Sequence, residues 1–368
     1  MTESGFHPQI QGRSPPRPPT GMTLAIGSMP HTDPRLAVEL ILDACPQAPC
    51  WPQLPALGFQ ENMMAQFSEV IPCVRVDRER KKVFIERSDS APEELAAFYE
   101  KVFAAESAGD LSAFALSESS ARGFTTFLRR FSSRAGPPPL FLKGQITGPL
   151  TFGLSVLDEQ GLPALFDDTF SDVVRQAIRL QALWQIERLQ SGPGAGILFV
   201  DEPVLAGFGS AAYINLSRVQ AVDTLREIFN AVKATGFLVG SHCCANTDWS
   251  LMVEAGVDII NFDAFTYLDS LALYTASLTG FLRRGGLLAW GLVPTQGPEN
   301  RSTPEELFRR LTAGIDMLVE HGFPRRELTR NLILTTSCGL GTLTEQGAEA
   351  TLRELKELGR LVQERLTA

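Results

Sequence analysis

The feature that most constrains the fold is the regular alternation of short apolar runs with longer amphipathic segments. The runs are nearly continuous in hydrophobic residues, which is typical of parallel strands buried on both faces. Such an alternation favours a single (β/α)8 barrel over residues 21–368, with a doubly wound open sheet as the alternative. The expected strands are Leu24–Gly27, Cys50–Leu54, Leu140–Lys143, Gly196–Asp201, Leu238–His242, Ile259–Phe262, Leu287–Gly291 and Leu332–Ser337.

Two segments fall outside this alternation. Residues 1–20 are rich in proline and polar side chains, so we expect a disordered tail there. After the second expected strand, residues 74–77 and 83–86 flank a polar turn, which predicts an exposed hairpin inserted into the barrel. The expected helices are Asp33–Cys45, Phe170–Gln190, Leu216–Thr235, Thr247–Ala255 and Thr303–Glu320.

Charge and cysteine content narrow the class of function. The 368-residue chain has a formal net charge of −9, which argues against nucleic acid or an anionic membrane as its main partner. No apolar stretch reaches the roughly 20 residues that cross a bilayer, and the N-terminus lacks the apolar core of a signal peptide. The six cysteines show no disulfide-framework spacing, so we expect a protein of the reducing cytoplasm.

Three side chains at strand ends have the chemistry of metal ligands. His242 and Cys244 lie two residues apart after one expected strand, and Cys338 follows the last one. In a barrel the carboxyl ends of all strands meet at one face, so these groups would converge. Two thiolates and an imidazole are preferred ligands of Zn²⁺, and Asp263, which follows a third strand, is a candidate fourth ligand. The alternative is that the cysteines are buried structural residues.

A zinc site of this kind suits chemistry on a thiol. A free thiol has a pKa of about 8.5 and is a poor nucleophile until it ionises. Coordination to Zn²⁺ removes the thiol proton at neutral pH. The ligand set therefore predicts an enzyme that presents a thiol substrate as a nucleophile.

Five motifs occur in the same order as in a known family, and the match covers roughly residues 22–345. On these motifs the chain resembles the catalytic C-terminal barrel of cobalamin-independent methionine synthase and its stand-alone relatives, within the uroporphyrinogen decarboxylase-like superfamily. The motifs are IleGlySerMetProHisThr at 26–32, LysGlyGlnIleThrGlyPro at 143–149, ValAspGluPro at 200–203, HisCysCys at 242–244 and SerCysGlyLeu at 337–340.

The resemblance implies a role for each matched position. It makes His242, Cys244 and Cys338 zinc ligands, and it places Asp263 where the family has a ligating glutamate. The implied reaction is transfer of a methyl group to homocysteine, which gives methionine. The residues implied to bind homocysteine are Asp201 for its amino group, Ile26 and Ser28 for its carboxylate, and Glu61 in a segment that resembles the lining of the family's pocket.

One departure bears on the methyl donor. The family has an Asp-x-His segment after the seventh strand that is thought to help protonate the folate, whereas residues 288–295 contain neither Asp nor His. An amine such as folate N5 needs a proton before it leaves, and a corrinoid cobalt does not. We therefore expect methylcobalamin or a related methylcorrinoid, carried on a partner protein, in preference to methyltetrahydrofolate.

Three other functions remain open from the sequence. A methylcorrinoid:coenzyme M-type methyltransferase uses a similar His-x-Cys and distant Cys, but its sulfonated thiol has no ammonium for Asp201 to bind. A uroporphyrinogen decarboxylase-like protein would need arginines near the first strand, and residues 27–32 contain none. A non-catalytic zinc- or corrinoid-binding protein is the third, although structural zinc sites normally have four protein ligands.

Overall fold

A computed structural model of the chain describes residues 15–132, 138–192, 194–296 and 302–366. Residues 1–14 of the expected disordered tail lie outside the described residues. In the described part of the expected tail, residues 15–20, the guanidinium of Arg17 donates a hydrogen bond to the side-chain oxygen of Asn331, and Pro18 is buried. No helix in the described ranges is both long enough and apolar enough to cross a membrane.

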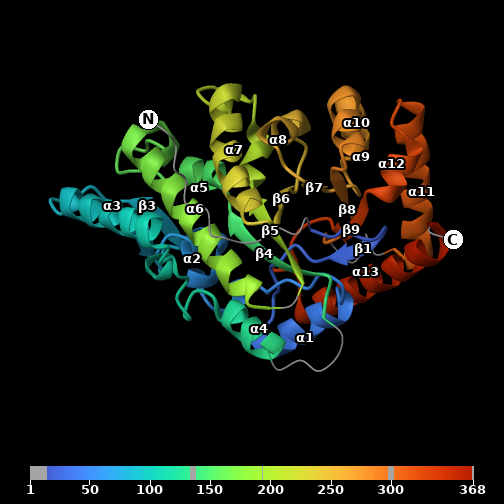
Figure 1. The fold of residues 1–368 in the computed structure, drawn as a ribbon, viewed down its shortest axis with the longest axis horizontal. Coiled ribbons are helices and arrows are strands. Elements are labelled where there is room, and N and C mark those ends of the chain that lie inside the picture. Colours follow the sequence, from blue (N-terminus) through green and yellow to red (C-terminus); the bar gives the residue numbers. More distant parts are fainter. Residues whose placement is uncertain (1–14, 133–137, 193, 297–301, 367–368) are drawn as a thin grey trace.

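Seven parallel strands form one curled sheet in the order β1-β9-β8-β7-β6-β5-β4, with helices outside it (Figure 1). The strands from β4 to β9 pair in chain order, and β1 pairs with β9. The winding is consistent with a TIM-like barrel. The strands are β1 Met22–Leu24, β4 Phe141–Thr147, β5 Ala195–Asp201, β6 Leu238–Cys243, β7 Ile259–Phe262, β8 Leu287–Val293 and β9 Leu332–Thr336.

The second expected strand, Cys50–Leu54, is not a regular strand in the structure. It makes single parallel bridges instead, Cys50 with Lys143 and Gln53 with Ser28, so the segment lies between β4 and the loop after β1. Prolines at positions 49, 52 and 55 explain the difference, because proline has no backbone N–H for a continuous ladder. Eight regular strands are therefore not confirmed, and the bridged segment occupies the gap between β1 and β4.

A separate two-stranded unit follows this segment. Strand β2 (Val74–Asp77) pairs antiparallel with β3 (Lys82–Ile85), and Lys81 takes a positive φ of 50° in the turn between them. Arg75 of β2 donates to Glu94 of helix α3 (Ala91–Ala108) at 2.6 Å, which ties the pair to that helix.

The helices begin and end close to where hydrophobic spacing predicts them. Each of the five expected helices is found within two residues of its predicted ends. Helix α11 begins with a capping box in which Thr303 and Glu306 exchange side-chain to backbone hydrogen bonds. The helices are α1 Pro34–Ala44, α2 Met63–Gln66, α3 Ala91–Ala108, α4 Arg122–Ser132, α5 Pro149–Ser155, α6 Asp168–Gln190, α7 Arg218–Ala234, α8 Trp249–Ala255, α9 Leu268–Leu271, α10 Thr275–Arg283, α11 Pro304–Glu320, α12 Arg325–Arg330 and α13 Glu345–Leu366.

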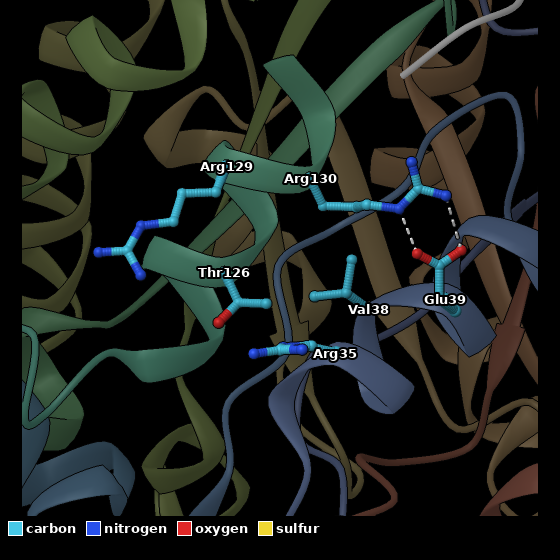
Figure 2. Close-up of a pocket in the computed structure, with 6 residues that line it drawn as sticks. All are labelled: Arg35, Val38, Glu39, Thr126, Arg129 and Arg130. Carbon is cyan, nitrogen blue, oxygen red and sulfur yellow. Dashed lines mark hydrogen bonds and ion pairs between the residues drawn. The ribbon is translucent and has the colours of Figure 1, made fainter. Parts of the chain in front are cut away.

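Helices α1 and α4 pack side by side and leave a surface cavity of about 420 Å³ between them (Figure 2). The carboxylate of Glu39 on α1 pairs with the guanidinium of Arg130 on α4 across it. Arg35 and Arg129 also line this cavity, and none of the site residues expected from the sequence does.

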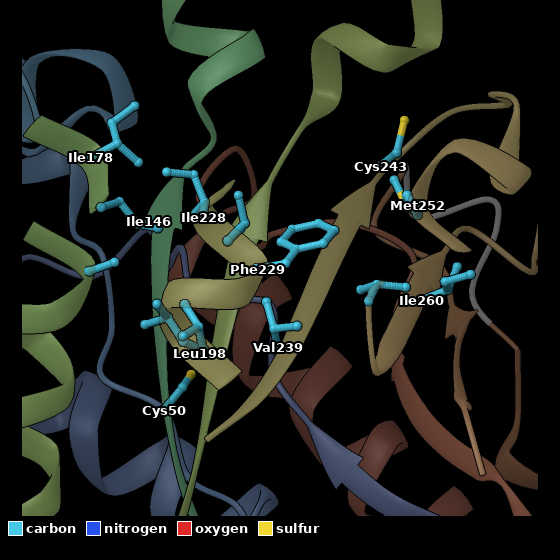
Figure 3. Packing of buried hydrophobic residues seen from close by; sticks show 14 of the residues in the cluster. Cys50, Ile146, Ile178, Leu198, Ile228, Phe229, Val239, Cys243, Met252 and Ile260 are labelled. Carbon is cyan, nitrogen blue, oxygen red and sulfur yellow. The ribbon is translucent and has the colours of Figure 1, made fainter. Parts of the chain in front are cut away.

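The core between sheet and helices is built from alternate residues of each strand. Leu198, Val239 and Ile260 point towards the helix layer, where they meet residues such as Ile228 of α7 and Met252 of α8 (Figure 3). Within each strand, the residues that alternate with these face the other side of the sheet, since successive side chains of a strand point in opposite directions. A second apolar cluster on that inner side comprises Met22, Leu24, Ala48, Phe141, Ile197, Phe199, Ile259, Leu287, Ala289 and Ile333.

Candidate metal centre and substrate cavity

A cavity of about 460 Å³, called here the strand-end cavity, lies where the carboxyl ends of the strands meet. It brings together seven of the eight residues expected from the sequence, which come from five widely separated stretches of chain. The eighth, Asp263, is not among its lining residues. The lining consists of Ile26, Ser28, Gln53, Pro55, Glu61, Asn62, Met63, Asp201, Pro203, His242, Cys244, Thr295, Gln296, Cys338, Gly339, Gly341 and Thr342.

Three side chains in this cavity form a sulfur–imidazole cluster: His242, Cys244 and Cys338. One potential ligand atom of each lies within 4.8 Å of those of the other two. His242 is the penultimate residue of β6, Cys244 follows that strand, and Cys338 follows β9, so backbone geometry sets their convergence. Cys243, between the first two, points to the opposite face and is fully buried in the core near Met252 (Figure 3).

Electrostatics within the cluster favour one ionised sulfur. Hydrogen bonds from Cys338 and His242 lower the pKa of Cys244 to about 4. The same shared hydrogen bond and burial raise the pKa of Cys338, which keeps its proton. Burial opposes a charge on His242, but its hydrogen bond to Cys244 and the nearby charge of Asp201 raise its pKa overall. The cluster therefore holds a thiolate between two donors.

Asn261 of β7 fixes the orientation of the imidazole. Its side-chain oxygen is hydrogen-bonded to Nδ1 of His242, its partner in strand register. Both hydrogens of the Asn261 amide are used, at 2.8 Å each, by the Ala289 carbonyl and the Thr335 hydroxyl. The oxygen must then accept from Nδ1–H, which leaves Nε2 for the cluster. Sequence reasoning assigned Asn261 no role, although an amide inside the apolar run Ile259–Phe262 was a usable signal.

Asp201 and Glu61 present unpaired carboxylate oxygens. Asp201 is 9% exposed, and its Oδ1 has no hydrogen-bond partner among the described residues. Glu61 is 1% exposed; its Oε1 accepts from the backbone N–H of Arg122 at 3.3 Å, while Oε2 has no partner in the same part of the chain. Burial raises the pKa of both groups, that of Glu61 to about 7. Both carboxyls line the strand-end cavity, and each has one oxygen without a donor. The other oxygen of Glu61 also lies 3.8 Å from the guanidinium of Arg122.

Glu202, next to Asp201, has a different environment. It is fully buried and accepts hydrogen bonds from the backbone of Leu150 and Thr151 at 3.0 and 2.7 Å, and from the Thr151 hydroxyl at 2.6 Å. These bonds anchor the start of α5 to the end of β5. Asp201 therefore lies in the cavity lining, whereas Glu202 holds α5 and β5 together.

The turn at residues 26–28 forms another part of the cavity wall. The Ser28 hydroxyl accepts from the N–H of Gly341 at 3.3 Å, and the Ser28 carbonyl accepts from Leu340 at 2.9 Å. The Ile26 carbonyl accepts a hydrogen bond from the ammonium of Lys143 at 2.6 Å. This wall is held by β4 and by the loop that carries Cys338.

Asp263 follows β7 as expected but lies outside the sulfur–imidazole cluster. Its carboxylate accepts from the backbone N–H of Thr266 at 2.9 Å, which closes the turn after the strand. Burial raises its pKa. The structure brings together three of the four expected metal ligands.

Comparison with solved structures supports the fold. A putative vitamin-B12-independent methionine synthase from Listeria monocytogenes has a TM-score of 0.51 and 13% identity, covering 90% of this chain and 86% of that one. A B12-independent methionine synthase from Shewanella sp. W3-18-1, in complex with selenomethionine, has a TM-score of 0.46 and 15% identity, covering 67% of each chain. At this identity the first likeness shows a shared fold alone. No protein-family model and no curated protein sequence matches the chain.

Proposed function

We propose that the protein is a zinc-dependent methyltransferase that transfers a methyl group to the sulfur of homocysteine. One observation carries the proposal: the strand-end cavity contains both the sulfur–imidazole cluster and two buried carboxyls with unpaired oxygens. The cluster suits a thiol, and the Asp201 carboxyl suits an ammonium group. An amino acid that bears a thiol has both.

The donor set fits zinc. Two sulfurs and an imidazole converge within 4.8 Å, and one sulfur has a pKa far below that of a free thiol. His242, Cys244 and Cys338 would hold the ion, and Asp263 as a fourth ligand stays a prediction. When bound, zinc supplies the Lewis acidity that keeps a substrate thiol ionised at neutral pH.

The remaining residues bind and orient the substrate. Asp201 would accept hydrogen bonds from the ammonium group, and the turn at 26–28 would hold the carboxylate through the Ile26 backbone and the Ser28 hydroxyl. Two carboxyls in the cavity lining disfavour binding of a sulfonated thiol such as coenzyme M, because like charges repel. For the same reason they disfavour a substrate with many carboxylates such as uroporphyrinogen. The geometry therefore favours homocysteine among the alternatives.

The expectation from the sequence about the methyl donor is revised. The neighbours in the structure comparison are described as B12-independent, which gives no support to a methylcorrinoid or to a corrinoid carrier protein. The sequence argument for a corrinoid was the lack of an acid after the seventh strand. Glu61 weakens that argument, because a cavity carboxyl with a pKa near 7 has a proton to give at neutral pH. We therefore propose methyltetrahydrofolate as the donor, with methylcobalamin as the alternative.

The test is a thiol-methylation assay on protein of measured zinc content, with homocysteine and either donor. Cys338→Ser should lose both zinc and activity while the fold survives, because it removes one ligand from a site of few ligands. Cys243→Ala is the matched control: it removes a neighbouring sulfur that faces the core, so zinc and activity should remain. A Cys338→Ser protein with normal zinc content and rate would contradict the proposal.

A further inference from the structure

A lysine is fully enclosed beneath the strand-end cavity. Lys143 lies in the middle of β4 with 1% of its surface exposed. Its ammonium donates to the Ile26 carbonyl at 2.6 Å and to Oε1 of Gln145 at 3.2 Å, and it lies 4.7 Å from the centre of the Phe199 ring. Both of these hydrogen-bond acceptors are neutral oxygens.

These contacts favour the charged form of Lys143. Burial lowers the pKa of Lys143, and the nearby Cys50, Asp201 and Cys45 act in the opposite direction. The groups that contact the ammonium, a carbonyl, an amide oxygen and an aromatic face, also interact favourably with a positive charge. A buried ammonium without a counter-ion is costly, so such groups are normally paired. Asp201 is the nearby acid that interacts with this charge electrostatically, and it would be occupied by the substrate ammonium.

Lys143 lies directly under the wall that would hold the substrate carboxylate. The Ile26 residue whose carbonyl it binds lines the cavity, and Lys143 itself does not. Gly27 has a φ of +144°, and a Cβ there would come within 2.9 Å of the Gln145 side chain, so Lys143 and Gln145 together shape this turn. The amide of Gln145 is fixed in turn by donating to the Trp51 carbonyl at 2.9 Å.

We propose that Lys143 is a positioning and specificity residue that makes the cavity select a thiol bearing a carboxylate. Its ammonium orients the Ile26 peptide and places a positive charge one peptide group below the bound carboxylate. The inference rests on the proposed function, and it adds that the carboxylate of the amino-acid thiol is recognised by a charge that lies outside the cavity lining.

The test compares two thiols that differ only in the carboxylate. These are homocysteine and 3-aminopropanethiol, which keeps the thiol and the amine. Their binding to zinc-loaded protein is measured by calorimetry, so that no methyl donor is required. For Lys143→Met we expect the Kd of homocysteine to rise about tenfold or more, since a charge at this depth is only partly screened. The Kd of 3-aminopropanethiol should change less than about twofold.

Two further variants separate charge from folding. Lys82→Met, at an exposed position of β3, should leave both affinities unchanged. Lys143→Gln removes the charge but keeps a donor, so it serves if the methionine variant does not fold, and it should show the same selective loss. Equal weakening of both thiols in the Lys143 variants, or no weakening, would overturn the assignment of Lys143 alone. Wild-type protein that binds neither thiol would instead overturn the proposed function and this inference with it.

Discussion

Replacing Glu61 by glutamine should change how the stability of the protein depends on pH. Glu61 is 1% exposed and ends a short 3-10 turn, Phe59–Glu61, in the wall of the strand-end cavity. One carboxylate oxygen accepts from the backbone of Arg122, and the other has no partner in the described chain. Burial raises the pKa of this carboxyl from its ordinary value of 4.5 to about 7.

The sign of the effect follows from proton linkage. In the unfolded chain Glu61 loses its proton above about pH 4.5, and in the folded protein only above about pH 7. Between these values unfolding releases a proton, so a rise in pH favours the unfolded state. The stability that the protonated carboxyl contributes is complete below pH 4.5 and is lost as the pH rises through 7. From pH 5 to pH 8 the wild-type protein should lose about 2.5 kcal/mol on this account.

The assay is urea unfolding of wild type and Glu61→Gln at pH 5, 6, 7 and 8. Other groups titrate in the same range, so the quantity of interest is the difference between the two proteins at each pH. That difference should shift by about 2.5 kcal/mol in favour of Glu61→Gln as the pH rises. Glu100→Gln, at an exposed position on α3, is the control and should show no such shift. A difference that stays constant from pH 5 to pH 8 would mean that Glu61 is ionised throughout, and the argument from burial would be wrong.

Two other substitutions test the construction of the site and its support. Asn261→Ala removes the acceptor for Nδ1–H of His242; we expect a loss of about 1–3 kcal/mol in stability and a 10- to 100-fold weaker zinc affinity, roughly, measured by unfolding and by chelator competition. Unchanged zinc affinity would contradict the orienting role. Gly123→Ala on α4 would place a Cβ 1.8 Å from the Pro52 carbonyl and should cost about 1–3 kcal/mol or more in urea unfolding. Gly280→Ala on α10 meets only the end of a flexible side chain and should cost little, so equal losses would contradict the contact.

The order of the elements could be predicted from the sequence, and two local errors show the limit of that prediction. Apolar runs located every strand of the curled sheet because strands buried on both faces have little room for polar residues. The run at Cys50–Leu54 was also predicted as a strand, but Pro52 within it and Pro49 and Pro55 beside it remove donors that a continuous strand ladder needs. The first strand was placed at Leu24–Gly27 and lies at Met22–Leu24. Hydrophobicity alone did not reveal that the Ile26 carbonyl bonds to a lysine side chain instead of a neighbouring strand.

The site was predictable to the extent that it depends on strand ends. His242, Cys244 and Cys338 lie at or just after the ends of strands that must meet, so their convergence could be inferred without knowing any distance. The groups that support these three residues could not be predicted in this way, because their positions depend on strand register. Asn261 lies opposite His242 in the β6–β7 pairing, and a shift of one residue would turn it to the other face. That register cannot be determined from a single sequence.

Around the strand-end cavity, the buried polar groups that support the site have hydrogen-bond partners, whereas two carboxyls that line the cavity do not have all of theirs. Lys143, Asn261 and Glu202 are buried, and each makes at least two hydrogen bonds, as buried polar groups in stable proteins do. Asp201 and Glu61 are also buried, yet each has an oxygen with no partner in the described chain, and both line the same cavity. An unpaired buried acceptor costs roughly 1–3 kcal/mol, which packing alone gives no reason to retain. A ligand with an ammonium group would supply the missing donors, so binding of such a ligand should raise the thermal stability of the protein beyond what a thiol without an amine achieves.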